Sequence, residues 1–66
     1  MFEFTIEGVV QGVGFRPFIY VHARKHNLVG FVQNNGNGVT IVCNNQEIMR
    51  QILQEPPELA QIERIT

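Results

Sequence analysis

Residues 2–18 read FEFTIEGVVQGVGFRPF and combine a strand pattern, a glycine-bearing loop and the start of a helix. Over residues 2–10, one face carries Phe2, Phe4, Ile6, Gly8 and Val10, and the other carries Glu3, Thr5 and Glu7. This period of two predicts a strand with one buried face. The alternation ends at residues 11–15, where two glycines in three residues permit backbone conformations that other residues resist.

The segment after this loop has the pattern of an amphipathic helix. Pro17 suits the first helical turn because its missing N–H costs nothing there, and Phe18 to His26 contains no Gly or Pro. We expect the helix to end at Asn27, which tolerates the left-handed conformation. The apolar stripe predicted to face a sheet consists of Phe15, Phe18, Ile19, Val21 and Ala23.

The middle of the chain predicts a hairpin followed by a second helix. Two apolar runs, Leu28–Asn34 and Val39–Asn44, flank Asn-Gly-Asn-Gly at residues 35–38, which is a strong hairpin signal. Asn44 with Glu47 three residues later resembles a capping box. The helix that follows places two i,i+4 pairs on one face, Ile48 with Ile52 and Met49 with Leu53.

The remaining residues leave two interpretations open. Pro56-Pro57 ends the second helix, after which Glu58–Thr66 fits either an edge strand with Ile62 or Ile65 inward or a turn of helix. The element order is strand, helix, strand, strand, helix and a final strand. It predicts an α+β, ferredoxin-like βαββαβ sandwich with a mainly antiparallel sheet and two helices on one face.

Composition bounds the class of protein. The 66 residues suffice for one domain, and a net charge of −1 leaves no excess of cations for a nucleic acid backbone. Cys43 is the only cysteine, so an intramolecular disulfide is excluded. A lone thiol and the lack of a signal peptide or membrane span in these residues favour a cytoplasmic setting without a membrane partner.

The loop between the first strand and the first helix is the best candidate for a binding site. Such a loop can turn consecutive N–H groups inward, and the adjoining helix N-terminus adds partial positive charge. Arg16 adds a guanidinium that can bind two phosphate oxygens. The loop lacks the Gly-Lys-Ser/Thr of the Walker motif, and Pro17 stands where the dinucleotide fingerprint needs a third glycine. A tight connection beside a solvated Arg16 is the structural alternative.

Four segments resemble the acylphosphatase family, whose pattern reads G-x-V-Q-G-V-x-F-R, then Ala-Arg-Lys in a helix, then G-W/F-V-x-N and a Gly-Val hairpin exit. The matching residues are Gly8–Arg16, Ala23–Lys25, Gly30–Asn34 and Gly38–Val39. Phe15–Phe18 and the downstream Pro56-Pro57 are most similar to the N-terminal domain of the carbamoyltransferases that mature hydrogenases. The resemblance spans most of the chain.

The resemblance implies an acyl phosphate hydrolase that uses neither a metal nor another cofactor. Its phosphate-binding loop would be Gln11, Gly12, Val13, Gly14, Phe15 and Arg16. Arg16 would bind phosphate and Asn34 would orient the attacking water, although Asn beside Asn35-Gly36 also fits plain turn chemistry. The substrate would be an acyl phosphate, in the carbamoyltransferase context carbamoyl phosphate, with inorganic phosphate as product or inhibitor.

The C-terminus departs from the family pattern, which continues through a complete fourth strand and often a short fifth. The domain assigned to residues 1–66 is therefore a fragment or a short stand-alone form, with an incomplete edge strand that predicts self-association. A second hypothesis is a weak or inactive module that binds phosphate or docks within a larger protein. An RNA-binding domain is disfavoured because Glu3, Thr5 and Glu7 occupy the open face of the first strand.

The sequence pattern argues against chemistry at three other groups of residues: a histidine pair, the cysteine and the carboxylates. His22 and His26 lie four residues apart, but no third zinc ligand is evident. Cys43 shares a strand face with Val39 and Ile41, which predicts a packed thiol rather than a nucleophile. The six carboxylates are all Glu and dispersed, so paired-carboxylate chemistry receives little support.

Overall fold

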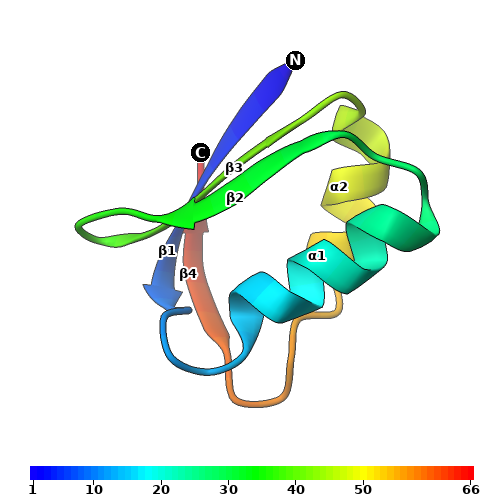
Figure 1. Ribbon diagram of the computed structural model, residues 1–66. Helices are drawn as coiled ribbons and strands as arrows, with labels where there is room; N and C mark the ends of the chain where they lie inside the picture. The colour runs from blue at the N-terminus through cyan, green and yellow to red at the C-terminus, as the bar shows by residue number, and fades with distance from the viewer.

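Four strands and two helices alternate in the computed structural model, which describes residues 1–66. They follow the order β1 (Phe2–Val9), α1 (Phe15–Lys25), β2 (Gly30–Asn34), β3 (Gly38–Cys43), α2 (Gln46–Leu53) and β4 (Gln61–Ile65). The sheet has the order β2-β3-β1-β4, and each neighbouring pair is antiparallel. Both helices cover the same face of the sheet (Figure 1). The predicted βαββαβ sandwich is confirmed.

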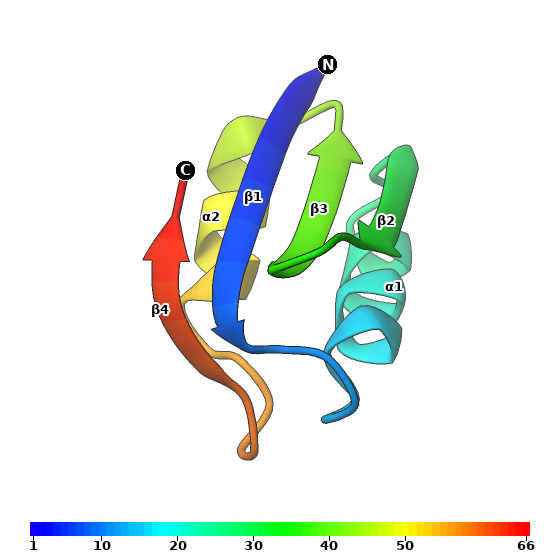
Figure 2. The same ribbon diagram turned by 90° about the vertical axis from the view of Figure 1, so that its left-hand side faces the viewer.

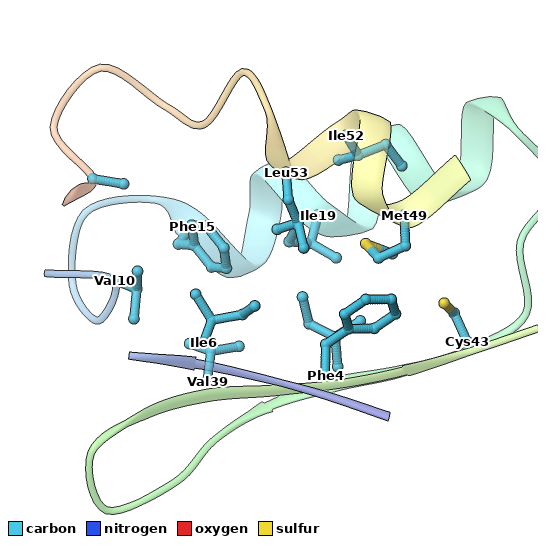
Figure 3. Close-up of a cluster of buried hydrophobic side chains, with 12 residues drawn as sticks. Phe4, Ile6, Val10, Phe15, Ile19, Val39, Cys43, Met49, Ile52 and Leu53 are labelled. Carbon is cyan, nitrogen blue, oxygen red and sulfur yellow. The ribbon is translucent and has the colours of Figure 1, made fainter. Parts of the chain in front are cut away.

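The alternation in β1 decides where the core lies. Phe4 is opposite Ile41, and Ile6 is opposite Val39, so the buried faces of the two central strands coincide. Figure 3 shows Phe4, Ile6 and Val39 pointing up toward residues of α1 and α2. The core comprises Phe4, Ile6, Val10, Phe15, Ile19, Val39, Ile41, Cys43, Met49, Ile52, Leu53 and Ala60.

The helix α1 has Pro17 in its first turn, as predicted. Its first residue is Phe15, because Gly14 in the left-handed conformation serves as the N-cap and its carbonyl accepts from Phe18 N at 3.1 Å. The end is as predicted: Asn27 has φ 57°, and Leu28 N donates back to Ala23 O at 2.9 Å, which is the Schellman pattern.

Two sequence expectations about the helices are wrong. Val21 is 55% exposed and does not join the buried stripe, because residues at 15 and 19 already define the face toward the sheet. The N-cap of α2 is Asn45 rather than Asn44, since the Asn45 side chain accepts from Ile48 N at 3.0 Å. Asn44 instead accepts from Val29 N at 3.1 Å and joins the start of β2 to the end of β3.

The C-terminal segment forms β4 rather than a helical turn. It pairs with β1 through Ile6 to Ile65 and Val9 to Gln61, with a bulge between Glu7 and Gly8. Ile62 packs against the core, whereas Ile65 remains 46% exposed. The fourth strand is therefore present and places β1 in the interior of the sheet, which leaves β2 and β4 at the two edges (Figure 2).

Candidate active site

The loop between β1 and α1 has the backbone conformation of an anion-binding nest. Gly12 and Gly14 have φ values of 75° and 78°, whereas the intervening Val13 is not among the residues with positive φ. Alternation of left-handed and right-handed residues turns successive N–H groups toward one side. A side chain at either glycine would meet nothing within 4 Å, so these positions require glycine for their φ and not for space.

The N–H groups of this loop are free to bind a ligand. No backbone N–H of residues 11–16 donates to an oxygen of the protein, and the first helical bond is the one from Phe18 to Gly14. The first turn of α1 holds no acidic residue that would neutralise the positive end of the helix. A row of free donors at a helix N-terminus favours a bound anion such as phosphate.

Arg16 supplies the charged group of the site. It is exposed in the first turn of α1, directly after the loop, and its guanidinium makes no side-chain hydrogen bond to the protein. An Arg whose donors are unused can bind two phosphate oxygens through its planar fork. Arg16 therefore lies beside the free N–H groups of the loop with its own donors unused.

Asn34 lies at the same end of the strands as the loop. β1 and β2 both run antiparallel to β3, so they are parallel to each other and end at one side of the molecule (Figure 2). Asn34 stands opposite Val39, which stands opposite Ile6, and residues in one such row share a face. The Asn34 side chain therefore projects from the face that carries α1, and it makes no side-chain hydrogen bond within the protein.

Gln11 holds the loop against the hairpin that carries Asn34. Its Nε2 donates to two carbonyl oxygens, Asn35 O and Gly38 O, each at 2.7 Å. The predicted loop residue therefore uses its side chain as a tie to the hairpin, and only its backbone N–H is free for a ligand. The sequence shows Gln11 beside the glycines but gives no sign of this contact, because its partners are 24 and 27 residues away.

Further hydrogen bonds stabilise the hairpin beside its contact with Gln11. Asn35 N donates to Gly38 O at 2.9 Å, and the Asn35 side chain bridges Asn37 N and Thr40 Oγ1, each at 2.8 Å. Asn35 thus makes the side-chain hydrogen bonds typical of a turn residue, a role that the sequence also allowed for Asn34. This leaves Asn34, one residue earlier, without a structural partner and available to a ligand or water.

The other candidate residues lie away from this loop. His22 packs its ring on Phe18 at 4.5 Å, and no three His, Cys, Asp or Glu side chains gather to hold a metal ion. Cys43 is buried with Val39 and Ile41, as predicted. Neither helix has the length and apolar character needed to cross a bilayer.

Residues 2–66 match the model of the acylphosphatase family, and the chain belongs to that family. The acylphosphatase of Bacillus licheniformis is 36% identical over 55 residues, which cover 80% of this chain and 61% of that protein. The fold and the loop thus agree with a family whose members hydrolyse acyl phosphates.

The chain is also similar to one end of a much larger protein. The probable carbamoyltransferase HypF of Methanocaldococcus jannaschii is 38% identical over 65 residues, which cover 91% of this chain and 8% of that protein. A crystal structure of full-length HypF in a phosphate- and nucleotide-bound form matches with a TM-score of 0.83 at 39% identity, covering 97% of this chain and 9% of that one. The chain therefore spans less than a tenth of its HypF relatives.

Proposed function

We propose that this chain hydrolyses acyl phosphates, with residues 11–16 as the phosphate cradle, Arg16 as the phosphate-binding cation and Asn34 as the residue that orients water. The observation that carries the proposal is the loop itself: six consecutive residues with unused backbone donors, the last of them the unpaired Arg16, at the end of the sheet where Asn34 ends β2. Membership of the acylphosphatase family supports the assignment.

The chemistry matches these groups. Water attacks phosphorus in line, a P–O bond forms to the water oxygen, and the P–O bond to the acyl oxygen breaks with its electron pair leaving on the carboxylate. A carboxylate or carbamate departs without protonation, so the site needs no strong acid. Its task is to hold the phosphoryl group and stabilise charge on its equatorial oxygens, which N–H donors and a guanidinium can do.

Asn34 acts by position. A neutral amide is not a base at ordinary pH, but its oxygen can accept a hydrogen bond from water and so direct the water's lone pair at phosphorus. The proton released from water passes to an oxygen of the substrate phosphate. Because Arg16 and the backbone donors supply the positive charge, we expect turnover to need no metal ion.

We further propose carbamoyl phosphate as a substrate, on the strength of the likeness to HypF carbamoyltransferases. Carbamoyl transfer itself would belong to a longer protein. A second candidate is a module that binds phosphate without turnover, favoured by the small share of the HypF chain that this domain covers. The two candidates share the loop and Arg16 and differ only in whether Asn34 positions an attacking water.

The test is release of phosphate from acetyl phosphate and carbamoyl phosphate in the presence of EDTA. Arg16→Ala is expected to lower kcat/KM by about 10² to 10³-fold, because it removes a donor that faces developing charge. Asn34→Ala is expected to lower kcat by about 10²-fold with little change in KM, because it misplaces water and leaves phosphate binding intact.

Two matched variants serve as controls. Arg24→Ala removes an exposed Arg from the other end of α1, and Asn37→Ala removes an exposed Asn side chain from the hairpin turn. Both are expected to keep parental rates. A folded parent that binds phosphate but shows no hydrolysis above buffer would favour the binding module. Hydrolysis that survives in both Arg16→Ala and Asn34→Ala would contradict the assigned roles.

A further inference from the structure

The outer edge of β2 is a row of unpaired backbone groups. Asn35 N donates to Gly38 O, so these two residues form a hydrogen-bonded pair of the β2–β3 ladder. Such pairs alternate along an antiparallel ladder, which leaves Gly30, Val32 and Asn34 with their N–H and C=O groups directed away from β3. β2 is an edge strand, so no other strand of this chain meets these groups.

An apolar groove runs beside this edge. It has a volume of about 260 Å³ and lies between α1 and β2, with 11 hydrophobic residues among the 13 that line it. Val32, Ile41 and Met49 contribute to its lining, while Tyr20 and Val29 remain 58% and 59% exposed. A residue on a strand added opposite Val32 would share its face and direct its side chain toward α1, into this groove.

The charges of the chain are distributed unevenly between a central segment and the residues on either side of it. Residues 8–46 contain no Asp or Glu, and Arg16, Arg24 and Lys25 give this segment a charge of +3. The remaining residues hold all six Glu against Arg50 and Arg64 and carry −4. The cationic segment contains α1, β2 and β3, which form one side of the molecule in Figure 2, with β1 and β4 on the other.

The cationic character extends to the groove. Arg24 is the only Lys, Arg, Asp or Glu among the groove residues, and its guanidinium lies 5.6 Å from the centre of the Tyr20 ring. The edge therefore combines backbone groups for a strand, an apolar volume for a side chain and a positive charge beside it. A strand that carries an apolar residue and, two positions away on the same face, an acidic residue matches all three features.

We propose that the outer edge of β2 binds an extended polypeptide segment that adds a strand to the sheet, with an apolar side chain in the groove beside α1 and acidic residues facing Arg24. The first test uses a capped seven-residue peptide with Phe at its centre, Glu two residues to either side of it on the same face, and Thr at the intervening positions. It is titrated into ¹⁵N-labelled protein. We expect shifts in the amide signals of β2 and of the C-terminal half of α1.

Modified peptides test the two parts of the proposal separately. N-methylation of alternate residues blocks either the donors that face β2 or those that face solvent, so only one of the two methylated peptides is expected to lose binding by tenfold or more. A peptide with Lys in place of Glu is expected to bind at least threefold more weakly, because Arg24 is the only charged residue that lines the groove.

Variants of the protein locate the site. Val32→Pro removes one outward N–H without breaking the pairing with β3, a position that tolerates proline, and should weaken binding about tenfold. Arg24→Glu should weaken it about fivefold, whereas Arg50→Glu, the same charge change on α2, should leave it within twofold. Far-ultraviolet circular dichroism establishes that each variant is folded, and Arg24→Glu decides the question if Val32→Pro does not fold.

Four results would overturn the proposal. One is the absence of spectral shifts at about 1 mM peptide, which is the lower limit of useful affinity. Another is a set of shifts that maps outside β2 and α1, or equal binding of the two methylated peptides. The last is a concentration-dependent dimer that occupies the β2 edge, which would assign this surface to a second copy of the chain.

Discussion

Gln11→Ala is the variant that most directly tests how the site is assembled. Gln11 Nε2 makes the only side-chain hydrogen bonds that join the loop of residues 11–16 to the hairpin, one to Asn35 O and one to Gly38 O, each at 2.7 Å. Their loss would free the loop from the strand that carries Asn34. We expect a modest loss of stability together with a larger loss of hydrolysis.

The structure sets the size of both effects. A typical hydrogen bond contributes about 0.5–1.5 kcal/mol net, which gives at most about 3 kcal/mol for the pair. The cost is smaller here because Gly38 O keeps its bond from Asn35 N and the bond to Asn35 O is exposed, where water can replace it. We therefore expect a loss of about 1–2 kcal/mol in the free energy of unfolding. A displacement near 1 Å between loop and Asn34 would lower kcat by up to about 10²-fold.

The assay combines thermal unfolding with acetyl phosphate kinetics. For a domain of this size, about 1–2 kcal/mol corresponds to a decrease in Tm of about 4–16 °C. Gln33→Ala is the matched control, because Gln33 is an exposed residue of β2 that makes no side-chain hydrogen bond. A Gln11→Ala protein with parental Tm and parental kcat would refute the reasoning. A lower Tm with unchanged kcat would limit Gln11 to a structural role.

Three further predictions concern the scaffold. Gly30→Ala should lower stability by more than about 2 kcal/mol in urea unfolding, because Gly30 has φ 144° and an added Cβ would meet the backbone carbonyl of Val42; parental stability would contradict this steric argument. Asn45→Ala should cost about 1 kcal/mol and Asn44→Ala less, because only Asn45 caps α2; equal losses would show that the cap is wrongly assigned. Cys43, 2% exposed, should react with a thiol reagent only as fast as the protein opens, and rapid labelling of the native protein would contradict its burial.

Local patterns predicted most of the secondary structure. The alternation of Phe4 and Ile6 with polar residues led to β1, and the Asn-Gly turn led to the β2–β3 hairpin. Both are signals within a few residues, where backbone conformation and the neighbouring side chains decide the outcome. The end of α1 at Asn27 was predictable for the same reason, since the left-handed conformation is a property of that residue.

Contacts with distant residues settled two points that the local pattern did not. Asn44 and Asn45 both have the side chain of an N-cap, and only the contact of Asn44 with Val29 N shows which of them is already engaged. Glu58–Thr66 had no decisive period, and pairing with β1 made it a strand. In each case a partner distant in sequence decided between two locally acceptable conformations.

By itself the sequence determined the βαββαβ order, the glycine-bearing loop and the position of Arg16 at the start of a helix, because these depend on the periodicity and conformational preferences of adjacent residues. Only the tertiary structure decided that Asn34 lies at the same end of the strands as the loop, that Gln11 ties the two together and that the edge of β2 lies open beside an apolar groove. The physical reason is that these contacts join residues more than 20 positions apart or depend on the order of strands in the sheet, and neither is set by interactions between neighbours along the chain.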